Sequence, residues 1–154
     1  MIEDRIGCSI RDYFERVGEA GFRDIEQSVI AELAAGDHGV VATGGGCVLR
    51  EANRRALHDN CHVLYLRSAP EDLFRRLRHD VKRPLLQVAD PLGRLRDLYA
   101  ARDPLYRETA HDLIETGRPS VAILVNMIVM QLELAGVVPP SGPEQPVPPE
   151  PPAS

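Results

Sequence analysis

The stretch Val40-Val41-Ala42-Thr43-Gly44-Gly45-Gly46 brings a run of small and β-branched residues directly into three consecutive glycines. Residues 40–43 are too few for an isolated helix, and their composition predicts a buried β-strand. The glycines lack side chains, so their backbone can approach a ligand closely and leave N–H groups free to bind it. A tight turn from a strand into a helix also needs glycine, and that purely structural role is the alternative. A place at the carboxyl end of a strand favours ligand binding, because open α/β sheets bind ligands there.

Two helices are expected before this stretch. Ser9 is typical of a helix N-cap, with Asp12 three residues later, and it opens a short helix that Gly18 ends. A second helix over about 19–35 shows apolar residues along one stripe. Gly36 is placed as the C-terminal stop of this helix.

Helices and strands alternate after the glycines. The expected helices are at about 49–58, 70–78, 91–101 with a restart at Pro104, and 120–135, and the expected strands are at 62–66 and 112–115. This alternation predicts an α/β fold with a parallel sheet. Residues 79–90 lack periodicity and are expected to form a mobile loop.

Composition limits the class of protein. The 154 residues fit one domain, expected over 1–136, and the net charge of −5 argues against a nucleic-acid partner. No segment approaches the roughly 18 apolar residues that span a membrane. The cysteines lack C-x-x-C spacing and are expected to be reduced, so a cytoplasmic location is predicted. Residues 137–154 predict a proline-rich, disordered tail, which is either passive or a ligand for an SH3-like partner.

Seventeen of the 18 basic residues are arginine, whose planar fork binds carboxylate and phosphate in a bidentate manner. Codon usage in a GC-rich genome is the alternative explanation. Arg23 and Glu26 are three residues apart and share one helix face. They form either a solvated ion pair or a pair in which Glu26 orients Arg23 toward a substrate carboxylate. Arg102 precedes the expected helix restart, where anions are favoured, and would complete a two-arginine clamp.

The loop over 79–90 contains Lys82, the chain's one lysine, and Arg83. Cations on a mobile loop suit a lid that closes over phosphate, although a basic surface loop is an equal alternative. The phosphate-binding pattern G-x-x-x-x-G-K-[ST] does not occur in this sequence. The five histidines show no metal-binding spacing, and no metal ligand is assigned.

Several motifs occur in one order. They are Gly7-x-Ser9-Ile10, Gly18-Glu19-x-x-Phe22-Arg23-x-x-Glu26, Ala42-Thr43-Gly44-Gly45-Gly46, Asn53-Arg54, Asp80-x-x-Arg83-Pro84-Leu85-Leu86 and Arg102-x-Pro104-Leu105-Tyr106. Over about residues 2–135 the chain resembles shikimate kinase. The resemblance implies a P-loop fold like that of nucleoside monophosphate kinases, with helices flanking a parallel sheet. It also implies phosphorylation of the 3-hydroxyl of shikimate by ATP and Mg²⁺ in aromatic amino-acid (chorismate) biosynthesis. The expected protein is a monomer that binds shikimate, with no nucleic-acid or membrane partner.

The resemblance also assigns residues. Those matching the shikimate contacts of the family are Arg23, Gly44, Gly45, Gly46 and Arg102; those matching its ATP contacts are Arg76, Arg83 and Arg118. Glu26 is expected to orient Arg23. No catalytic residue is assigned, because the phosphate-loop lysine and the Asp-x-Asp motif of the family have no counterpart here.

One strand–loop–helix–strand unit of the family, about 30 residues, has no counterpart in the chain. Its first strand lies, in the family, between the strands that match residues 40–43 and 62–66. Two hypotheses follow: a truncated shikimate kinase that is inactive alone, or a non-catalytic, kinase-derived protein that binds shikimate or a partner. A gluconate-type kinase fits the clamp and the glycines less well. An in-frame phosphate-loop motif upstream of the first codon would support truncation, and a nearby in-frame stop would support the second hypothesis.

Overall fold

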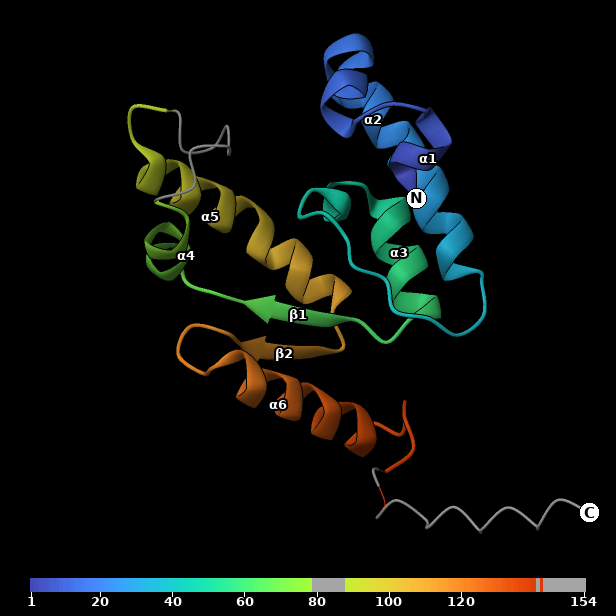
Figure 1. The fold of residues 1–154 in the computed structure, drawn as a ribbon, viewed down its shortest axis with the longest axis vertical. Helices are drawn as coiled ribbons and strands as arrows, with labels where there is room; N and C mark the ends of the chain where they lie inside the picture. The colour runs from blue at the N-terminus through green and yellow to red at the C-terminus, as the bar shows by residue number, and fades with distance from the viewer. Residues whose placement is uncertain (79–87, 141, 143–154) are drawn as a thin grey trace, which may run out of the picture. The chain divides into compact units, whose positions relative to one another are not determined.

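The computed structural model describes residues 1–78, 88–140 and 142. The chain divides into two compact units, Met1–Gly117 and Arg118–Ser154. The first unit contains α1 (Ile2–Ile6), α2 (Ile10–Ala34), the 3₁₀ turn η1 (Cys47–Leu49), α3 (Glu51–Asn60), β1 (Leu64–Arg67), α4 (Pro70–Leu77), α5 (Pro91–Thr109) and β2 (Asp112–Glu115), and the second contains α6 (Val121–Leu134) (Figure 1).

The long helix α2 consists of two segments joined at a kink. Ser9 Oγ accepts a hydrogen bond of 3.1 Å from the backbone N–H of Asp12, which confirms the predicted N-cap. Gly18 has φ 75° and ψ −179°, values that lie outside the helical region and that glycine adopts at low cost. The predicted break therefore occurs at Gly18. The helix resumes directly after this residue and ends at Ala34.

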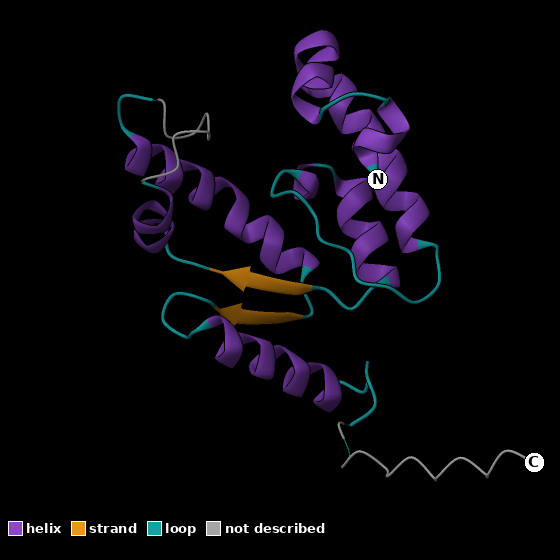
Figure 2. Cartoon of the chain, viewed as in Figure 1, coloured by secondary structure: helices purple, strands orange, loops and turns teal. Residues whose placement is uncertain are grey.

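The strands β1 and β2 are parallel and lie in register from Leu64 opposite Asp112 to Arg67 opposite Glu115. The segment between them contains α4 and α5, so the unit is a βαβ crossover. Figure 2 shows these two strands as the sheet of the described residues. The two predicted strands and the parallel arrangement are confirmed.

The prediction of a buried strand at residues 40–43 is wrong. These residues are irregular and exposed, and Val40 is fully exposed, at 101% of its reference area. A strand is stable only where a neighbour satisfies its backbone hydrogen bonds, and neither β1 nor β2 pairs with this segment. The β-branched composition therefore gave the right propensity without the partner that a strand requires.

The predicted helix restart at Pro104 is also wrong, because α5 is continuous and contains Pro104 in its interior. Two hydrogen bonds on the N-terminal side of the proline attach this part of the helix to β1. Asp103 Oδ1 accepts a hydrogen bond from the Tyr65 hydroxyl at 3.0 Å, and Tyr99 Oη accepts one from Arg67 Nε at 2.7 Å. These bonds fix α5 alongside β1, and they offset the cost of a proline that lacks an N–H donor.

The hydrophobic core of the first unit lies directly behind the glycine turn. Ile30 from α2, Cys47 and Val48 from η1, and Leu57 from α3 form one buried cluster. The partly buried residues packed against this cluster are Ala56, Cys61, Val63, Leu105 and Tyr106. Three helices therefore position the turn from behind; Gly44 and Gly45 are exposed, whereas Gly46 is buried.

The second unit contains the helix predicted at about 120–135. Ser120 caps α6, because its Oγ accepts a hydrogen bond from the backbone N–H of Ile123 at 3.4 Å. None of the residues of α6 is buried. Among the described residues, no helix combines the length and apolar character needed to cross a membrane.

The outcome at residues 40–43 gives a matched pair of substitutions. Val48 is 4% exposed and Val40 is fully exposed. We expect Val48→Ala to lower the free energy of unfolding by about 1–3 kcal/mol, because it removes buried methyl groups. Val40→Ala should change it by less than about 0.5 kcal/mol. Equal losses in denaturant titrations would show that Val40 is buried in a strand after all.

Candidate functional site

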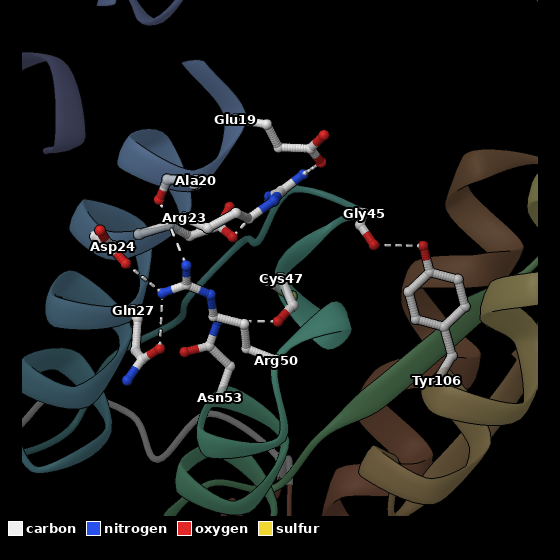
Figure 3. Close-up of polar contacts among 11 residues, drawn as sticks. Glu19, Ala20, Arg23, Asp24, Gln27, Gly45, Cys47, Arg50, Asn53 and Tyr106 are labelled. Atoms are coloured by element: carbon white, nitrogen blue, oxygen red, sulfur yellow. Dashed lines mark hydrogen bonds and ion pairs between the residues drawn. The ribbon is translucent and has the colours of Figure 1, made fainter. Parts of the chain in front are cut away.

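The site begins with a buried ion pair on α2. Arg23 Nη1 lies 2.7 Å from Glu26 Oε1, and the two side chains are 14% and 6% exposed. The pair is therefore not a solvated surface pair. Among the described residues, the carboxylate partner of Arg23 Nη2 is the exposed Glu19, at a longer distance of 3.6 Å (Figure 3). Because a buried charge needs a partner, Glu26 holds one edge of the guanidinium and leaves Nη2 weakly engaged.

The glycine turn contacts two arginines that are far apart in the sequence. A Cβ atom placed on Gly46 would lie 2.6 Å from Arg23 Cζ, so the guanidinium of α2 occupies the space that a side chain would need. A Cβ on Gly45 would lie 3.6 Å from Arg102 Nη1 on α5. The structure therefore brings Arg23, Arg102 and the turn together, although Arg102 lies inside a helix and not at its start.

Each backbone carbonyl of the turn accepts a hydrogen bond. The bonds to its carbonyls are Cys47 N–H to Gly44 O at 3.2 Å, Tyr106 O–H to Gly45 O at 2.6 Å and Leu49 N–H to Gly46 O at 3.2 Å. Within the described residues, nothing accepts a hydrogen bond from the three glycine N–H groups. Two guanidinium groups thus lie beside a turn whose carbonyls already accept hydrogen bonds and whose N–H groups are free within the described part of the chain. This arrangement favours an anionic or hydroxyl oxygen as ligand.

Helix α3 supports the turn from behind. Asn53, 1% exposed, donates from Nδ2 to Cys47 O at 2.9 Å, and Arg54 Nη1 donates to Val48 O at 2.7 Å. Both residues stand in the sequence motifs, but no role was predicted for them. Burial raises the pKa of the Cys47 thiol, so this cysteine stays neutral and is a poor nucleophile.

Of the three arginines predicted to contact ATP, the structure describes Arg76 and Arg118. Arg76 donates from Nη2 to the backbone carbonyl of Thr116. Arg118 is exposed and is the first residue of the second unit. Arg83 and residues 79–87 of the predicted lid lie outside the described residues. Nucleotide binding by these arginines stays a prediction.

The described residues do not by themselves fit a magnesium nucleotide. Among them, no group of three or more His, Cys, Asp or Glu side chains could hold a metal ion. The sequence also lacks a phosphate-binding glycine loop with its lysine. No step of phosphate transfer is therefore assigned to the residues of this chain.

The βαβ unit defines an α/β protein, in which two arginines from different helices lie beside the glycine turn. The family model described as shikimate kinase matches residues 1–133, and the chain belongs to the shikimate kinase family. It is 58% identical over 137 residues to a shikimate kinase of Burkholderia pseudomallei, covering 89% of this chain and 74% of the relative. A shikimate kinase of Ralstonia nicotianae is 55% identical over 145 residues, with 94% and 76% covered.

Two solved structures show the same fold. Shikimate kinase from Acinetobacter baumannii, in complex with shikimate, matches with a TM-score of 0.76 and 42% identity, covering 88% of this chain and 75% of that one. Shikimate kinase from Bacteroides thetaiotaomicron matches with a TM-score of 0.75 and 26% identity, covering 89% and 80%. The predicted fold class, that of the P-loop kinases related to nucleoside monophosphate kinases, is confirmed, and the chain spans part of it.

The contact between Gly46 and Arg23 gives a matched test within the turn. Gly46→Ala would place a methyl group within the space of the Arg23 guanidinium, whereas a Cβ on Gly44 meets only Glu26 Oε2, at 4.0 Å. We expect Gly46→Ala to destabilise the chain by about 1–3 kcal/mol in denaturant titrations, because it overpacks a buried ion pair. Gly44→Ala serves as the control with little effect. Similar stabilities of the two variants would contradict this geometry.

Proposed function

We propose that Arg23, Arg102 and the glycine turn form the shikimate-binding site of this protein. The observation that carries the proposal is the convergence of two guanidinium groups, from α2 and α5, on residues 45 and 46. The structure of the Acinetobacter baumannii relative contains shikimate and shares this fold, which supports the choice of ligand.

The chemistry of the ligand suits this arrangement. Shikimate carries one carboxylate and three hydroxyl groups on a small ring. An arginine fork binds a carboxylate through two parallel hydrogen bonds, and Arg23 is already oriented by Glu26. The free N–H groups of the turn then donate to the remaining oxygens of the ligand. Partial burial of Arg23 strengthens these bonds, since water competes less for the charge.

We further propose that the complete enzyme transfers the terminal phosphate of ATP, with Mg²⁺, to the 3-hydroxyl of shikimate. On this proposal Arg76, Arg83 and Arg118 belong to the nucleotide side, and residues 79–90 act as the lid. The groups that hold the ATP phosphates and the metal would come from a phosphate-loop segment that this sequence lacks. The 154-residue chain would then be inactive alone. We also propose that the protein is a cytoplasmic monomer.

A chimera tests the need for the missing segment. The purified chain should show no ATP-dependent phosphorylation of shikimate in a coupled assay. Joining the phosphate-loop segment of a longer family member to its N-terminus should produce turnover, because the ATP-binding groups are then present. Turnover by the chain alone would refute the proposed inactivity. A folded chimera that binds shikimate without turnover would instead favour a non-catalytic shikimate-binding protein.

The arginine clamp predicts a split between the two substrates. In the active chimera, Arg23→Lys and Arg102→Lys keep the charge but lose the fork, and each should raise KM for shikimate about 10- to 100-fold. KM for ATP should change by less than about twofold, because neither residue is assigned to the nucleotide.

Two exposed arginines serve as controls on the same helices. Arg11 on α2 pairs with Glu15, and Arg96 on α5 pairs with Glu71. Arg11→Lys and Arg96→Lys should leave both KM values unchanged, since exposed pairs contribute little. If the Arg23 and Arg102 variants raise both KM values equally, these residues do not form a shikimate clamp.

A further inference from the structure

One hydrogen bond to the glycine turn comes from outside its own segment. The carbonyls of Gly44 and Gly46 are satisfied within the turn and η1, whereas Gly45 O accepts a bond of 2.6 Å from the hydroxyl of Tyr106. Tyr106 lies 61 positions further along the chain, on α5 (Figure 3). It follows Arg102 by four residues, so both project from the same face of that helix.

This bond fixes a peptide plane. The carbonyl of Gly45 and the N–H of Gly46 belong to one planar trans peptide, and in such a peptide they point in opposite directions. Glycine on both sides leaves this peptide easy to rotate. By holding the carbonyl toward α5, Tyr106 determines the direction of the Gly46 N–H, which is one of the free donors of the turn.

Tyr106 is itself braced. Its ring packs against that of Tyr65 on β1, with centroids 4.9 Å apart and planes tilted by 36°. The Tyr65 hydroxyl donates to Asp103, which also accepts from Arg107 Nε at 2.8 Å. Burial, and then the hydrogen bond to Asp103, raises the pKa of Tyr65, so this phenol stays protonated and keeps donating. The rings therefore place the Tyr106 hydroxyl with little freedom.

We propose that Tyr106 is a positioning residue of the shikimate site: it holds the peptide between Gly45 and Gly46 so that the Gly46 N–H is presented to the substrate. It does not touch the substrate. This inference rests on the proposed function, because it takes the turn and the two arginines as the shikimate site. The hydrogen bond from Tyr106 connects the turn to α5, the helix that also carries Arg102.

The test is Tyr106→Phe in the 154-residue chain, with Tyr99→Phe as the matched control. Tyr99 lies on the same helix, and its hydroxyl accepts a hydrogen bond from Arg67 and interacts with Asp103 and Arg107, but among the described residues it makes no hydrogen bond to the turn. Calorimetry should show the dissociation constant for shikimate rising about fivefold in Tyr106→Phe, equivalent to about 1 kcal/mol for one hydrogen bond. Tyr99→Phe should bind as the unchanged chain does.

The amide resonance of Gly46 distinguishes a positioning role of Tyr106 from a general contribution to stability. In ¹H–¹⁵N spectra of the free chain, Tyr106→Phe should shift the Gly46 amide and speed its hydrogen exchange, with the same thermal midpoint as Tyr99→Phe. The shift that shikimate causes at the Gly46 amide should shrink in Tyr106→Phe alone.

The outcomes separate this inference from the proposed function. If the unchanged chain binds shikimate, Arg102→Lys weakens binding and Tyr106→Phe does not, the positioning role is overturned while the site stands. If the unchanged chain does not bind shikimate, the proposed site fails, and the positioning role for this substrate fails with it. An unaltered Gly46 amide in the free Tyr106→Phe chain overturns the positioning role whatever the binding result.

Discussion

The ion pair between Arg23 and Glu26 is the constraint on which the site depends. Burying a guanidinium is costly unless a partner compensates its charge, and Glu26 supplies that partner from one helical turn away. The paired guanidinium then fills the space beside Gly46, where any side chain would collide with it. Glycine at this position is therefore a packing requirement, and the close approach of the turn to the charge follows from it.

The turn obtains its polarity from the way its carbonyls are used. Two are satisfied locally, and the third is satisfied by Tyr106 from α5. Asn53 and Arg54 take the carbonyls of the next two residues, Cys47 and Val48. Acceptors are thus consumed around the turn while its donors stay available beside two positive charges. This distribution suits a small acid with hydroxyl groups and does not suit a cation.

The sheet of the described residues consists of two strands. β1 and β2 satisfy each other, and the segment 40–43, which leads into the turn, is exposed and unpaired within the described part of the chain. The chain covers 75% of the shikimate kinase from Acinetobacter baumannii and 80% of that from Bacteroides thetaiotaomicron, so both relatives are longer. The site proposed for shikimate is nevertheless assembled, because helices α2, α3 and α5 pack around the turn without a strand at residues 40–43.

The sequence by itself determined what depends on neighbouring residues. The Ser9 cap and the break at Gly18 follow from local propensity, and the motifs indicated the family. Only the tertiary structure decided what depends on distant partners. The spacing of Arg23 and Glu26 fits a solvated or a buried pair equally. The pair is buried because other elements of the fold, such as η1 and α3, pack against α2. Likewise, valines become a strand only beside another strand, and no local pattern links Tyr106 to a carbonyl 61 residues away.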